Sequence, residues 1–157
     1  MRSIGIGSVA LVMACVLGAV CFHVTTAAQK EVVQASEKLD GKWYVVRQEQ
    51  FGGAVPATVA KRLNVVIDGA KMEWYIGNPA PNMAATLTVD PEKKTMDAKV
   101  TRGSLNGKTM LGIYKLEGDT LKVCFDDFGK KRPTEFKAKA DSKQSIYVLK
   151  REKKKDK

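Results

Sequence analysis

The sequence predicts an all-β fold, an antiparallel β-barrel of about eight strands with one short helical segment. From residue 42 to residue 152, apolar and polar residues alternate in short runs that are separated by glycine, proline, asparagine and aspartate. Most runs come in pairs joined by short turns, which is typical of β-hairpins. Such strands must hide their edges in a barrel or a sandwich, and consecutive hairpins favour an up-and-down barrel.

The N-terminal segment has the pattern of a secretory signal peptide. Arg2 precedes an uncharged apolar run over residues 4–22, and the small residues Thr26, Ala27 and Ala28 follow it. A basic start, an apolar stretch and a small-residue cleavage site are the three parts of such a signal. We therefore expect residues 1–28 to be a signal peptide that is cut after Ala27 or Ala28, and the protein to be exported to the periplasm or the extracellular space.

Two other interpretations of this segment compete with cleavage. The apolar run is about as long as a membrane-spanning helix needs to be, so it could remain as an anchor. Cys15 lies in "VMAC", which loosely resembles the lipid-attachment signal of bacterial lipoproteins. However, the residues after Cys15 stay apolar and Met13 fits that signal poorly.

Removal of the leader limits the chemistry that remains. Cys15, Cys21 and His23, the only histidine, leave with it, so Cys124 is the one cysteine of the mature chain. No internal disulfide can then form. A chain without histidine cannot build a Ser/His/Asp or Cys/His nucleophile or a zinc site with imidazole ligands. We expect a protein that is not an enzyme and that carries no metal and no cofactor.

The mature chain divides into three parts. Residues 29–38 form a polar spacer, residues 39–152 form the barrel domain, and residues 153–157 form a basic tail. The chain has 27 basic and 17 acidic residues, and "KREKKKDK" at 150–157 supplies much of the excess. Charge runs at chain ends are usually solvated, and the functional alternative is contact with an anionic envelope polymer or a lipid surface. The tail lacks aromatic residues for base stacking, so no nucleic acid is expected as a partner, and we expect a monomer.

The first part of the domain predicts a strand, a helical turn and a hairpin. "KWYVVRQEQF" at 42–51 is the strand, and "PATVAKRL" at 56–63 can form one or two helical turns that begin at Pro56. A hairpin follows around residues 68–70. One face of this hairpin is apolar and should point to the core; it contains Leu63, Val65, Ile67, Met72, Trp74 and Ile76.

The second part predicts two more hairpins and the last strands. "ATLTVDPEKKTMDAKVT" turns at "DPEKKT". In "LGIYKLEGDTLKVCF" a two-residue turn at Gly118 and Asp119 would pair Leu116 with Leu121, Tyr114 with Val123, and Gly112 with Phe125. Glycine opposite Phe125 leaves room for the ring. "RPTEFKAKA" at 132–140 and "SIYVLKRE" at 145–152 are expected to be the last strands.

Four segments together resemble a known family: "LDGKWYVV" (39–46), "LGIYKLEGDTLKVCF" (111–125), "KKRPTEF" (130–136) and "YVLKRE" (147–152). The chain resembles the small exported lipocalin-like domains of unknown function that are abundant in planctomycete bacteria. The resemblance covers residues 37–152, and "GDTLKVCF" followed by "RPTEF" is its specific part. It implies a lipocalin-like β-barrel outside the cytoplasm, and it implies no catalytic residues.

The motif Gly41-x-Trp43 is also similar to the first-strand motif of true lipocalins. In that family the tryptophan packs at the closed end of the barrel against a basic residue of the last strand. The resemblance therefore implies a structural pair between Trp43 and Lys150 or Arg151, with Arg151 as our choice.

Polar residues of the 124–132 region have ordinary structural explanations. Asp126 and Asp127 are adjacent on a strand, so their side chains point to opposite faces and do not form a carboxylate pair. Cys124 should lie opposite Val123 and Phe125, as a small packed residue. The run Lys130 to Arg132 is either a solvated turn or a guard at the mouth of the barrel.

The aromatic residues Trp74, Tyr114 and Phe125 should converge on the interior, together with Trp43. A barrel of this size is either filled by side chains or holds one small ligand. If it holds a ligand, we expect a small hydrophobic or amphiphilic molecule with an anionic end that Arg132 meets at the rim.

Overall fold

The computed structural model describes residues 38–153 and shows nine antiparallel strands and one short helix, α2. The predicted signal peptide, nearly all of the spacer and residues 154–157 lie outside the described residues. The elements are β1 Gly41–Gln50, β2 Gly53–Ala54, α2 Ala57–Ala60, β3 Leu63–Asp68, β4 Lys71–Ile76, β5 Met83–Asp90, β6 Thr95–Arg102, β7 Thr109–Glu117, β8 Thr120–Asp126 and β9 Gln144–Arg151.

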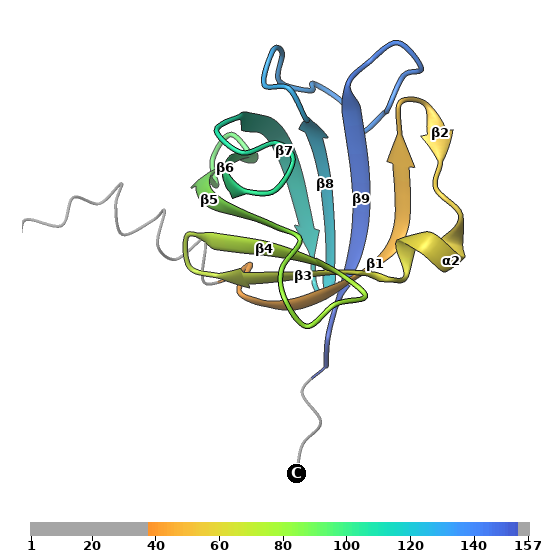
Figure 1. Cartoon of the computed structure of the whole chain (residues 1–157). Helices are drawn as coiled ribbons and strands as arrows, with labels where there is room; N and C mark the ends of the chain where they lie inside the picture. Colours follow the sequence, from red (N-terminus) through yellow and green to blue (C-terminus); the bar gives the residue numbers. More distant parts are fainter. Residues whose placement is uncertain (1–37, 154–157) are drawn as a thin grey trace, which may run out of the picture.

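Eight of these strands close into a barrel. Each strand from β3 to β9 pairs with the next along the chain, and β1 pairs with both β3 and β9. The very short β2 pairs only with the last two residues of β1 (Figure 1). The predicted up-and-down antiparallel barrel is therefore confirmed, with α2 beginning after Pro56 as expected.

The predicted hairpin registers are confirmed. Leu116 pairs with Leu121, Tyr114 with Val123, and Gly112 with Phe125. A Cβ atom on Gly112 would lie 2.6 Å from both the Phe125 ring and the carbonyl oxygen of Met96. Glycine is therefore needed here because the ring crosses directly over the partner strand.

Two sequence predictions were wrong. Ile76 is about half exposed although its partner Leu63 is in the core, because it is the last residue of β4, next to the β4–β5 connection. Residues 132–140 do not form a strand. Since β8 pairs with β9 along its whole length, no free edge remains for this segment, and Pro133 has no N–H to donate to a ladder. It forms instead part of the long β8–β9 connection.

The barrel has two different ends. At the first, which we call the terminal end, the chain's first and last described residues meet and the connections between strands are two, four and two residues long. At the other, which we call the loop end, the β4–β5, β6–β7 and β8–β9 connections contain six, six and seventeen residues. In Figure 1 the β8–β9 connection lies at the top and β9 runs down to the terminal end.

Candidate functional site

The interior of the barrel is packed with side chains. Trp74, Tyr114 and Phe125 belong to one continuous core cluster, with 4%, 6% and 1% of their surfaces exposed. A cavity that admits water would leave its lining side chains with accessible surface. The burial of these three aromatic residues in one cluster therefore fits a barrel that is filled by side chains.

Arg132 does not join those aromatics. Its guanidinium binds the Asp97 carboxylate with both terminal nitrogens, at 2.5 and 2.8 Å, and donates a further bond of 2.7 Å to the Gly112 carbonyl. Asp97 alternates with the buried residues Met96 and Ala98, so it lies on the outer wall. The structure thus places Arg132 outside the barrel, where it holds the β8–β9 connection against β6 and β7.

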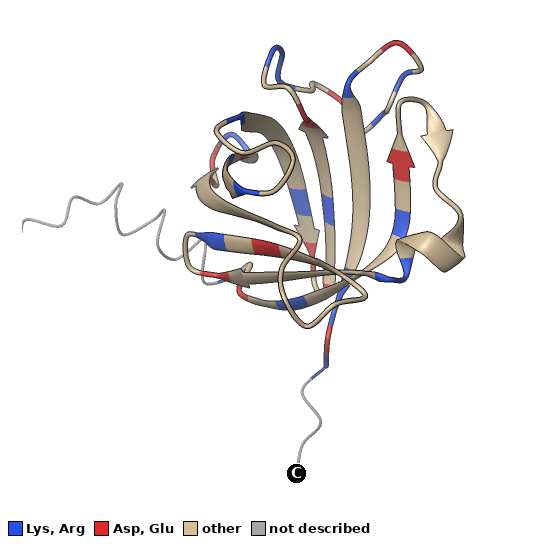
Figure 2. Cartoon of the chain, in the orientation of Figure 1, with Lys and Arg blue, Asp and Glu red and all other residues tan. Residues whose placement is uncertain are grey.

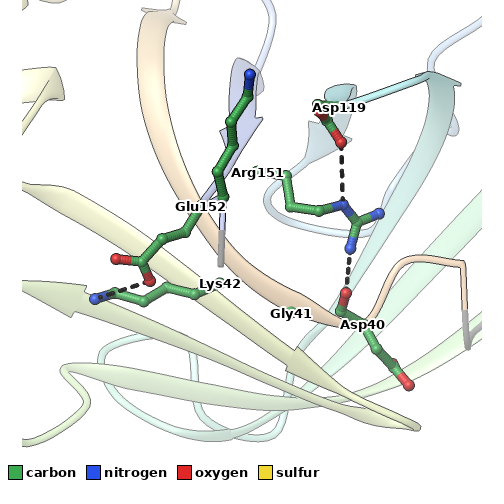
Figure 3. Close-up of a pocket in the computed structure, with 7 residues that line it drawn as sticks. Asp40, Gly41, Lys42, Asp119, Arg151 and Glu152 are labelled. Carbon is green, nitrogen blue, oxygen red and sulfur yellow. Dashed lines mark hydrogen bonds and ion pairs between the residues drawn. The ribbon is translucent and has the colours of Figure 1, made fainter. Parts of the chain in front are cut away.

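The terminal end is organised by Arg151. Its guanidinium carbon lies 4.1 Å from the centre of the Trp43 ring, the contact that the lipocalin motif implies. It also donates to the Asp40 carbonyl and lies 3.8 Å from the Asp119 carboxylate (Figure 3). A further bond goes to the Lys38 carbonyl. The Trp43 indole donates to the Leu39 carbonyl at 2.8 Å. These contacts fasten the segment before β1 across the end of the barrel.

A surface hollow of about 670 Å³ lies beside this pair. Lys42, Glu152 and Lys153 border it together with Asp40, Gly41, Asp119 and Arg151. Lys42 is 3.4 Å from the Glu152 carboxylate (Figure 3). The Tyr44 hydroxyl donates to the same carboxylate, and these partners lower the pKa of Glu152. Most charged groups of the hollow are therefore already paired within the protein.

The loop end differs because polar side chains point into the barrel there. Phe125 pairs with Ser145, which pairs with Gln50. Val123 pairs with Tyr147, which pairs with Gln48. Directly paired residues share a face of the sheet, and Phe125 and Val123 belong to the core. Four polar residues thus face inward above an otherwise apolar interior; they are Gln48, Gln50, Ser145 and Tyr147.

Asp127 completes this group, which we call the loop-end cluster. The Ser145 hydroxyl, fully buried, donates to the Asp127 carboxylate at 2.6 Å. Burial raises the pKa of Asp127 to about 6, although the Ser145 bond lowers it and the neighbouring Asp126 carboxylate raises it further. Burial likewise raises the pKa of Tyr147 to about 12, opposed by hydrogen bonds with Ser145, Gln50 and Gln48. Perturbed groups gathered in one place are typical of functional sites.

Two exposed aromatic rings flank the cluster. Phe51 and Phe128 are 47% and 44% exposed. The Phe51 N–H donates to the Gln144 carbonyl, and the Asp127 N–H donates to the Lys143 carbonyl. Both rings therefore belong to chain segments that are fixed to the beginning of β9. Phe51 has a positive φ of 50°, which is rare for a bulky residue and marks a tightly held turn.

Cys124 does not contribute to this site. It pairs with Ile113 and Ile146 on the face opposite Phe125, as predicted, and its side chain is fully buried. Burial raises the pKa of its thiol to about 11, so the reactive thiolate is scarce at neutral pH. Within residues 38–153, no group of three or more potential metal-ligating side chains is gathered.

Comparison of the chain with protein-family models, with curated proteins and with solved structures finds no match. None of the helices in the described part of the chain has the length and apolar character to span a membrane.

A β-bulge in β1 hides the loop-end cluster from the alternation pattern of the sequence. The pairing of β1 with β9 shifts between Val45 and Arg47. Trp43 and Val45 face inward before the bulge, and Gln48 and Gln50 face inward after it. Strict alternation would have placed Arg47 and Glu49 inside. The one sequence signal for the cluster was that Ser145 and Tyr147 lie on the same face of the last strand as the apolar Leu149, since the three occupy every second position.

Proposed function

We propose that this protein is an exported, non-enzymatic binding module with a lipocalin-like barrel, and that its loop-end cluster holds a small ligand. The observation that carries the proposal is the set of polar side chains that face inward at one end of a packed, apolar barrel. In a small-molecule site, a few placed polar groups fix the ligand and apolar or aromatic surface covers the rest.

The arrangement of the strands supports the choice of this end. Loops on a rigid scaffold carry binding residues more often than the scaffold itself does. The longest connection of the domain, residues 127–143, lies at the loop end and contains Asp127 and Phe128. Because the interior is filled, the ligand would bind over the core and not within it.

Export and the absence of catalysis are part of the proposal. The leader pattern of residues 1–28 and the resemblance to exported planctomycete domains support a location in the periplasm or outside the cell. The loop-end cluster contains no histidine, and its serine donates to a carboxylate without a neighbouring base. This arrangement supports binding more than nucleophilic catalysis.

The test is to map ligands by nuclear magnetic resonance. The full chain is expressed with its own leader, purified in its exported form, and titrated with a library of small aromatic and polar fragments. We expect binding fragments to shift the amide signals of residues 48–51, 126–128 and 143–147. Shifts confined to the terminal end, or no saturable shifts with any fragment, would overturn the proposal.

A second candidate function is contact of the terminal end with an anionic polymer or lipid surface. Lys42, Arg151 and Lys153 border the hollow, and the basic tail continues from Lys153. In Figure 2, however, acidic segments lie among the basic ones on strands and loops. Deleting residues 154–157 should abolish salt-sensitive binding to anionic vesicles if this function holds, and should leave fragment binding at the loop end unchanged.

A further inference from the structure

We infer that the ligand of the loop-end cluster carries a cationic group, an ammonium or a guanidinium, which pairs with the Asp127 carboxylate. This inference rests on the proposed function and names its ligand class. It replaces the anionic ligand end that the sequence suggested, since that hypothesis depended on Arg132 at the rim, and Arg132 is bound to Asp97 on the outer wall.

Asp127 is a partly buried carboxylate whose side-chain hydrogen-bond partner is a neutral hydroxyl. Its side chain accepts a hydrogen bond from the Ser145 hydroxyl, and none of the ion pairs within residues 38–153 involves it. A carboxylate that leaves water normally needs an opposite charge or several donors as compensation. The cluster therefore lacks one positive charge, which a ligand can supply.

The neighbouring Asp126 strengthens this demand. It is buried on the opposite face of the strand, and its carboxylate accepts bonds from the backbone N–H groups of Phe128 and Lys130, at 3.1 and 3.2 Å. Its negative charge is adjacent to Asp127 and uncompensated by a basic side chain in the described chain. An anionic ligand would meet repulsion from both residues.

The aromatic rim also suits a cation. Ring faces attract ammonium and guanidinium groups through the ring quadrupole. The ammonium of Lys143 already lies 5.5 Å from the centre of the Phe51 ring, in the segment next to the cluster. The Phe51 ring thus already faces a cation of the protein itself, and the ring of Phe128, one residue after Asp127, is exposed and can face the cation of a ligand.

The remaining members of the cluster would orient the ligand. The amides of Gln48 and Gln50 and the hydroxyl of Tyr147 provide donors and acceptors in fixed positions, since Gln48 is 8% exposed and Tyr147 packs against the core. Such groups hydrogen-bond to the N–H groups of an ammonium or to a neighbouring polar atom of the ligand. The ion pair with Asp127 would supply the affinity for the cation, and the hydrogen bonds to these neutral groups would fix the orientation of the ligand.

The experiment compares three probes with the same aromatic body: phenethylamine, phenethyl alcohol and phenylpropionate. Each is titrated by calorimetry into the exported protein, and the site of binding is followed by the amide signals of residues 126–128 and 143–147. We expect the amine to bind at least about tenfold more tightly than the alcohol, as hydrogen bonds to charged groups are stronger than neutral ones, and the carboxylate to bind most weakly.

Variants identify the group responsible. In Asp127→Asn the amine should lose its advantage over the alcohol. Asp141→Asn, which removes an exposed acid from the same connection, is the matched control for net charge and should keep the advantage. If Asp127→Asn does not fold, the ranking of the three probes on the unmodified protein still decides whether the site prefers a cation.

Each outcome has one meaning. Equal binding of amine and alcohol at the loop end, or tighter binding of the carboxylate, would overturn the cationic ligand while the proposed function stands. An amine preference that survives in Asp127→Asn would also overturn it. Absence of any loop-end shifts with all three probes would overturn it and, together with failure of the fragment library, the proposed function as well.

Discussion

The two ends of the barrel use charged residues in opposite ways. At the terminal end Arg151 contacts the Trp43 ring, two backbone carbonyls and Asp119. Glu152 forms an ion pair with Lys42 and accepts a hydrogen bond from the Tyr44 hydroxyl. At the loop end Asp127 has a hydroxyl as its side-chain partner. The first arrangement compensates its charges and closes the barrel. The second leaves the Asp127 charge without a basic partner, which lowers the stability of the fold at neutral pH and suits a cationic ligand.

The connections differ in the same sense. The short turns at the terminal end contain few residues outside the strands, so this end offers little loop backbone from which a binding site could be built. Long loops cost little extra closure entropy and can position side chains that the strands do not need for packing. Under the proposed function, structure and binding are separated along the barrel axis, and substitutions at the two ends should have separable effects.

The largest expected effect is on stability at the terminal end. Trp43→Ala should lower the free energy of unfolding by about 3–5 kcal/mol, because a fully buried ring is lost and Arg151 loses its stacking partner. Chemical denaturation followed by circular dichroism measures it. Fragment shifts at the loop end should persist in the folded fraction. A loss below about 1 kcal/mol would show that the terminal end does not hold the barrel closed.

The middle of the barrel is tested by Gly112→Ala. The added Cβ would lie 2.6 Å from the Phe125 ring, and a packed interior gives the ring no space to move into. We expect a loss of about 1–3 kcal/mol in the free energy of unfolding. An unchanged stability would mean that space exists beside Phe125, and the interior would again become a candidate for the ligand.

At the loop end, Asp127→Asn should stabilise the protein at neutral pH. The pKa of Asp127 is raised in the folded protein from its ordinary value of 3.8 to about 6. The folded protein favours the neutral, protonated form of Asp127. The stability that this form contributes is therefore fully present below about pH 3.8 and is lost as the pH rises through about 6. Since one pKa unit corresponds to about 1.4 kcal/mol, the variant should gain about 1–3 kcal/mol above about pH 7.

This gain should vanish in acid, and the pH series is its own control. Unfolding curves of both proteins between about pH 4 and about pH 8 should converge at the acid end, where Asp127 is protonated and neutral like asparagine. Asp141→Asn should follow the unmodified protein throughout. A variant that is less stable at every pH would indicate that the Asp127 carboxylate is a structural acceptor and not an uncompensated charge.

The smallest effect concerns the ion pair on the outer wall. Arg132→Gln should cost at most about 1 kcal/mol, because the pair with Asp97 is about one-third exposed and screened by water. It should leave the preference for an amine at the loop end unchanged. A loss of ligand binding in this variant would return Arg132 to the site, as the sequence had suggested.

Much of the barrel could be predicted because the turn residues and the alternation within each hairpin determine its register locally. Gly118 and Asp119 set the β7–β8 register, and Gly112 opposite Phe125 followed from it. The segment 132–140 was mistaken for a strand because alternation alone does not reveal whether a sheet edge is free to accept it. The loop-end cluster escaped prediction because one extra residue at Val46 exchanges the inner and outer faces of β1.

The most direct test of the contrast between the ends is a carboxyl titration of the purified protein by nuclear magnetic resonance. One experiment follows Asp127 at the loop end and Glu152 at the terminal end. We predict that Asp127 titrates near pH 6 and that Glu152 titrates below its ordinary value of 4.5. An Asp127 that titrates at or below Glu152 would show that its charge is already compensated, and would contradict the proposed division of the barrel into a structural end and a binding end.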